Sequence, residues 1–158
     1  MEHITRQEML AATVKDFLDS KELHYEVIGD DNEIFTLHMP LRGCKLNNCR
    51  LFIKASDDSI QTHAVCPINA SPDVYDKVVE FITRANYGLK LGNFEFDYSD
   101  GEIRYHTCQY MEEGVPGEED VAHHILIAYS MMKRYGDGLV KSLMGFGDPK
   151  ADIAEIEG

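Results

Sequence analysis

The segment from residue 94 to residue 106 constrains the fold of this chain most strongly. It reads FEFDYSDGEIRYH, so apolar and polar residues alternate on both sides of Asp100-Gly101. Such alternation is typical of half-buried strands, and Asp-Gly favours a tight hairpin turn. A two-residue loop would place Asp97 opposite Arg104. The core face of this hairpin would then hold Phe94, Phe96, Tyr98, Ile103 and Tyr105, and the outer face Glu95, Asp97, Arg104 and His106.

Two further pairs of strand-like segments precede this hairpin. The first spans residues 25–39 around Gly-Asp-Asp-Asn at 29–32, and the second joins 49–55 to 60–66 through Ser-Asp-Asp-Ser at 56–59. Short polar turn formers between β-rich segments predict hairpins. We therefore expect an antiparallel sheet of five to six strands.

Helical periodicity predicts the remaining elements. Thr5 and Glu8 have capping-box spacing at the start of a helix over residues 5–21. Ser71 as N-cap and Pro72 at the first helical position predict a second helix, after the second hairpin.

A third, longer helix is expected to begin at the acidic residues 118–120. Gly136 and Gly138 interrupt its pattern, and because each costs on the order of 1 kcal/mol relative to Ala, we expect a bend or loosening there. A short last helix at 148–158 is expected to fray. The order α-ββ-ββ-α-ββ-α(-α) indicates an α+β fold, and without a repeat or a long linker we expect one domain over residues 1–158.

The charge balance limits the partners. The chain has 158 residues, with 15 Lys and Arg against 28 Asp and Glu, a net charge of −13. Nucleic acid and anionic membrane surfaces are therefore poor partners. No apolar run approaches the roughly 18 residues of a membrane span, and the first residues have no secretory pattern, so we expect a cytoplasmic protein.

Four cysteines raise the question of a metal or redox site. Without an export signal, free thiols packed as small apolar side chains are the preferred interpretation, with no cofactor. The alternative is a zinc or thiol-redox site formed by Cys44, Cys49, His63 and Cys66. Only the first cysteine pair approaches the spacing of structural zinc sites, and the pattern is not repeated.

Catalytic motifs are missing from the sequence. There is no GxSxG elbow, and His123 and His124 are adjacent on a helix, where neighbouring side chains point about 100° apart. We therefore expect no enzymatic activity. A cleft lined by Glu95, Asp97 and His106 would leave a small-molecule hydrolase or transferase as a further alternative.

The central motif NYGLKLGNFEFDYSDGEIRY, residues 86–105, resembles the signature of the bacterial YbjN family. The resemblance extends to the helix opened by Pro72, to YGDGLVKSLMGFG at the end of the third helix, and to the ending DPKADIAEIEG. It covers residues 49–158 by motif and the first 48 by element order, and the loop from Cys44 to Cys49 departs from the pattern. It implies a fold similar to class I type III secretion chaperones, often as homodimers, with no established enzymatic chemistry. Such proteins are named as proposed regulators, including of sensory transduction, or as chaperone-like binding proteins.

We therefore expect a non-enzymatic protein-binding module, chaperone-like or regulatory, that binds a protein or peptide partner or a second copy of itself. The expected mode is capture of an amphipathic or extended segment. The candidate partner-binding residues are Glu95, Asp97 and Arg104 on the outer hairpin face and Val121, Ile125 and Tyr129 on the third helix.

Overall fold

The computed structural model describes residues 2–158, which form a six-stranded antiparallel sheet with four α-helices. This confirms the expected α+β fold and the order of its elements. In chain order the elements are α1 (Arg6–Ser20), β1 (Glu26–Ile28), β2 (Ile34–Pro40), β3 (Asn48–Ala55), β4 (Ser59–Val65), the 3₁₀ turn η1 (Pro72–Val74), α2 (Tyr75–Asn86), β5 (Asn93–Phe96), β6 (Ile103–Tyr110), α3 (Glu118–Leu143) and α4 (Pro149–Glu157).

The strands lie in the order β1-β2-β3-β4-β6-β5. The first four strands form a meander. The chain then crosses through α2 to β5 at the far edge and returns along β6, which lies between β4 and β5. This return brings β4 and β6, which are far apart in sequence, into direct antiparallel pairing.

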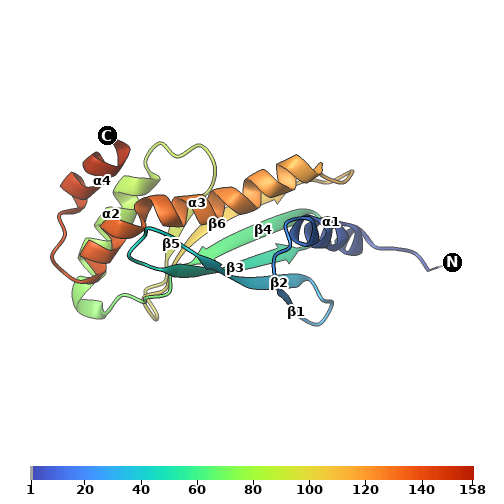
Figure 1. Cartoon of the computed structure of the whole chain (residues 1–158), viewed down its shortest axis with the longest axis horizontal. Helices are drawn as coiled ribbons and strands as arrows, with labels where there is room; N and C mark the ends of the chain where they lie inside the picture. Colours follow the sequence, from blue (N-terminus) through green and yellow to red (C-terminus); the bar gives the residue numbers. More distant parts are fainter. Residues whose placement is uncertain (1) are drawn as a thin grey trace.

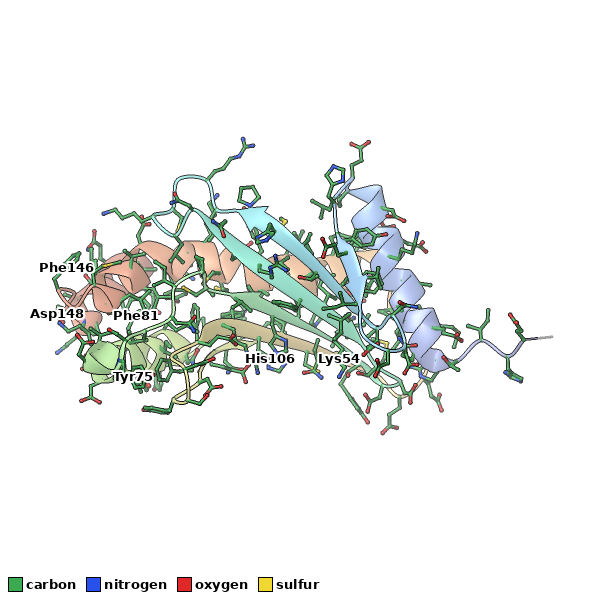
Figure 2. All side chains as sticks on the ribbon, turned by 90° about the horizontal axis from the view of Figure 1, so that it is seen from below. Lys54, Tyr75, Phe81, His106, Phe146 and Asp148 are labelled. Carbon is green, nitrogen blue, oxygen red and sulfur yellow. The ribbon has the colours of Figure 1, made fainter. Side chains whose placement is uncertain are left out.

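The helices cover one face of the sheet. α3 runs along the strands, α1 lies near the end that holds β1, and α2 and α4 pack together at the opposite end (Figure 1). Seen from below, the strands lie in front of α3 (Figure 2). The strand side chains buried against the helices include Phe35, Leu37, Leu51, Ile53, Ile60, Ala64, Ile103 and Tyr105. The alternate residues of the same strands form the opposite face, which we call the open face.

The last hairpin keeps its expected faces, but the predicted register is wrong by two residues. Glu95, not Asp97, lies opposite Arg104. The loop is longer than two residues, because the N–H of Asp97 donates to Glu102 and the N–H of Gly101 donates to Asp97. A shift of two leaves each strand residue on the same face. Asp97 and Tyr98 move from the expected strand into the loop, and Tyr98 is 65% exposed rather than in the core.

α3 passes through both glycines without a break, so the expected loosening is wrong. A Cβ added to Gly136 would lie 2.4 Å from the sulfur of Cys44, and one added to Gly138 would lie 2.8 Å from the ring of Phe81. The glycines are therefore places where other elements approach the helix closely. They are not breaks in it.

The helix ends follow the sequence signals with one exception. Thr5 and Glu8 form the full capping box of α1, and the side chain of Asp148 accepts N–H bonds at the start of α4. The Ser71 hydroxyl instead donates to Asp73 and caps nothing. α4 is held along its length, with Ile153 in the core and Glu157 bonded to Tyr135, which argues against the expected fraying.

Among residues 2–158, no helix combines the length and the apolar character that crossing a lipid bilayer requires.

Candidate functional site

A cluster of ionisable side chains lies on the open face where β4, β6 and β5 run side by side. His63 of β4 is directly opposite His106 of β6, and Glu95 of β5 is directly opposite Arg104 of β6. Arg104 and His106 are two residues apart on one strand, so both side chains point to the same face. We call His63, Glu95 and His106 the His-Glu cluster.

The three side chains of the His-Glu cluster converge on a small volume. The carboxylate Oε1 of Glu95 lies 3.6 Å from Nδ1 of His106 and 3.9 Å from Nε2 of His63. The imidazole rings stack with centroids 4.5 Å apart and an angle of 20° between their planes. Arg104 Nε donates to the same Glu95 oxygen at 2.9 Å.

The surroundings of His63 set its protonation state. Burial lowers the pKa of His63 to about 4, assisted by the positive charge of Arg104 and by His106, and opposed by Glu95. His63 is therefore neutral at neutral pH. Nε2 of His106 lies 3.0 Å from the amide oxygen of Gln61, which can accept a hydrogen bond from this nitrogen. The other ring nitrogen, Nδ1, faces Oε1 of Glu95.

A depression of about 440 Å³ adjoins the cluster. The apolar side chains on its wall, Ile34, Phe52 and Val65, are half-buried. Its polar wall consists of Lys54, Arg104, Gln61, Glu102 and His63. In Figure 2 the labelled Lys54 and His106 lie on this side of the sheet. The open face therefore combines apolar contact area with charged side chains of both signs.

The expected partner-binding residues are only partly available. Glu95 and Arg104 lie on the open face and are paired with one another. Asp97 lies beyond the strand, where Ser99 donates to it through its backbone and its hydroxyl and so lowers its pKa.

The predicted apolar helix face is wrong as an accessible surface. Val121 and Ile125 are 0% and 1% exposed, because this stripe of α3 packs on the sheet. Tyr129 is half-buried, and its hydroxyl donates to the carbonyl of Pro40.

The structure does not bring together the four residues of the alternative zinc or redox site. Cys44, Cys49 and Cys66 are buried with the core, whereas His63 lies on the open face. Within residues 2–158, no three potential ligands that include a cysteine converge. Burial raises the pKa of Cys49 to about 12 and that of Cys66 to about 11, which keeps both as unreactive thiols.

The hydrolase alternative required Glu95, Asp97 and His106 to share a cleft. Glu95 meets His106, and Glu95 and Asp97 line one depression of about 260 Å³, but the three side chains do not converge on a single point. His123 and His124 have ring centroids 6.2 Å apart, and Nδ1 of His124 is bonded to the carbonyl of Asp120.

Sequence reasoning placed His106 on the outer hairpin face but missed its pairing with His63. The alternation of each strand indicates which face each histidine occupies. The missing information is that β6 pairs with β4 across the α2 crossover, which no local signal in either strand contains.

Comparisons with known proteins extend the fold description. No family model matches the chain, and no curated protein matches it. Among solved structures, YbjN of E. coli, described as a proposed transcription regulator, superposes with a TM-score of 0.59 over 80% of this chain and 87% of that chain. This chain has the YbjN fold. The resemblance to YbjN seen in the sequence is thus confirmed for the fold, at 11% sequence identity.

Proposed function

We propose that this chain is a non-enzymatic protein-binding module and that the open face of its sheet is the binding surface. The observation that carries the proposal is the absence of any helix over this face among the described residues, although the face presents half-buried apolar side chains. Apolar contacts at the centre of a surface, with a polar rim, are typical of protein interfaces.

The charge of the open face indicates the kind of partner. Arg50, Lys54 and Arg104 outnumber Glu26 and Glu95 on its strands, whereas the whole chain carries a charge of −13. Complementary charge steers association and selects partners. We therefore propose an acidic segment with apolar anchors as the partner, received beside Phe52.

Nucleic acid is a poorer occupant of this surface. The positive charge is local, and the strongly acidic remainder of the chain would repel a polyphosphate backbone. A regulatory role, as described for YbjN of E. coli, would then be exercised through protein contacts.

Self-association is a second candidate, favoured by a free sheet edge. Within residues 2–158, β1 pairs only with β2, and its residues Val27 and Ile28 are both 41% exposed. Pairing of two β1 edges would extend the sheet across a homodimer and cover these side chains.

The test of the proposed function compares two variants of equal charge change. Arg50→Glu/Lys54→Glu reverses the charge of the open face, and Lys21→Glu/Lys133→Glu changes exposed lysines on α1's end and on α3. Each tagged protein is used to recover partners from an extract of its source cells at low salt, and recovered proteins are quantified by mass spectrometry.

We expect a defined partner with wild type and with the α1/α3 variant, and its loss with the open-face variant. Cross-linking should place that partner on β3 and β4. Equal recovery by both variants, or cross-links confined to the helical side, would overturn the proposal. Circular dichroism confirms that both variants are folded.

A further inference from the structure

We propose that the His-Glu cluster, His63, Glu95 and His106, is a binding site for a divalent transition-metal ion, with zinc as the probe. Each of the three residues offers a ligand atom within 4.8 Å of the other two, and Oε1 of Glu95 faces both Nε2 of His63 and Nδ1 of His106. Two imidazoles and one carboxylate form a donor set that suits zinc and its neighbours rather than calcium or magnesium.

Two of the three separations between ligand atoms are close to those around a tetrahedral ion. Zinc-ligand bonds of about 2.1 Å imply about 3.4 Å between the ligand atoms of a tetrahedral site. The separations from the Glu95 oxygen, 3.6 Å to His106 and 3.9 Å to His63, exceed this by a few tenths of an ångström. Binding would also require the two stacked imidazole rings to rotate so that a nitrogen of each faces the ion.

A neighbouring amide orients one of the two histidine rings. A metal-binding histidine generally donates its other N–H to a neighbouring oxygen, which fixes the ring orientation. Gln61 provides that oxygen for His106, 3.0 Å from Nε2.

The His-Glu cluster is accessible to solvent. The side chains of His63 and His106 are 19% and 24% exposed, and that of Glu95 is 36% exposed. Three protein ligands leave a fourth position for water or for a side chain of a bound partner.

Arg104 competes with a metal ion for the Glu95 carboxylate. Its Nε donates to the same Glu95 oxygen that the metal would use, and its positive charge opposes a cation. Replacing this guanidinium with an apolar side chain of similar length should therefore strengthen binding. If Glu95 and the two histidines formed no metal site, removing the Arg104 guanidinium would not increase zinc affinity.

Isothermal titration of the metal-free full chain with zinc tests the site. We expect one ion per chain, and a loss of affinity of at least about 100-fold in His63→Ala/His106→Ala because two of three ligands are removed. The matched control, His24→Ala/His123→Ala, removes two exposed histidines elsewhere and should bind as wild type does. Absence of saturable binding in wild type, or equal loss in both variants, overturns the proposal.

Two further measurements do not depend on the double alanine variant folding. Arg104→Met should bind zinc several-fold more tightly, and an unchanged or weaker affinity contradicts the shared-oxygen geometry. In wild type, cobalt should broaden the NMR signals of His63, Glu95 and His106 selectively. Broadening centred on other histidines overturns the site. These tests use metal alone, so their outcome is independent of whether the open face binds a protein.

Discussion

Gly138 on α3 provides a test in which sequence and structure predict opposite signs. Judged from the sequence, Gly138 interrupts a helix, so Gly138→Ala should stabilise the protein by about 1 kcal/mol because alanine is the better helix former. In the structure the added Cβ would lie 2.8 Å from the ring of Phe81 and 2.9 Å from Cδ1 of Ile156. Both contacts are well inside the usual carbon separation of about 3.5–4.0 Å.

The net effect follows from comparing the two terms. Inserting a methyl group into a packed core costs typically 1–3 kcal/mol, and two contacts on opposite elements place this position at the upper end, about 2–3 kcal/mol. Subtracting the gain in helix propensity leaves a loss of about 1–2 kcal/mol. For a chain of this length that corresponds to a fall in Tm of roughly 2–8 °C.

Urea and thermal unfolding followed by circular dichroism measure this effect. Ser130→Ala, an exposed position on the same helix, is the control and should be stabilising by no more than about 0.5 kcal/mol. Ile156→Ala removes one of the two obstructing side chains, so the double variant with Gly138→Ala should be more stable than the sum of the single effects predicts. A stabilised Gly138→Ala would refute the close approach of α2 and α4 to α3.

Three other outcomes are expected. A thiol reagent at pH 8 should modify only Cys108 in the native protein, because the other three cysteines are buried. After unfolding, it should modify all four cysteines. Rapid modification of a second thiol in the native protein would contradict this burial. Folding lowers the pKa of His63 from 6.5 to about 4. Between pH 6.5 and pH 4 this histidine therefore binds a proton in the unfolded chain but not in the folded chain. Stability should therefore fall as pH is lowered from 6.5 to 4, by on the order of 2 kcal/mol, and His63→Gln, but not His123→Gln, should reduce this dependence in urea unfolding. Light scattering should give about twice the 17.9 kDa chain mass if β1 edges pair, and Val27→Lys should return it to one chain mass; a wild-type mass near 17.9 kDa at micromolar concentration sinks the homodimer.

The candidate site shows how far local patterns extend. Alternation along residues 94–106 correctly placed Glu95, Arg104 and His106 on one face, because a strand repeats every two residues. It could not bring His63 to them, since that depends on which strands become neighbours. The same limit explains why the four residues of the alternative zinc or redox site do not meet: sequence proximity of His63 to Cys66 suggested one site, but alternation along β4 sends His63 to the open face and leaves Cys66 in the core.

The apolar stripe of α3 illustrates a second limit. Its spacing identified Val121 and Ile125 as one helix face but could not say whether a partner or the chain's own sheet covers it. Likewise, Gly136 and Gly138 look like breaks by propensity, although close approach of other elements requires them.

The sequence by itself determined the elements that arise from interactions between near neighbours: the capping box of Thr5 and Glu8, the three hairpins and the α+β order. These depend on backbone geometry and side-chain periodicity within a few residues. The tertiary structure decided the pairing of β4 with β6, the covered and open faces of the sheet, and the meeting of His63 with Glu95 and His106. Those features depend on contacts between distant segments, whose partners are chosen only when the whole core packs.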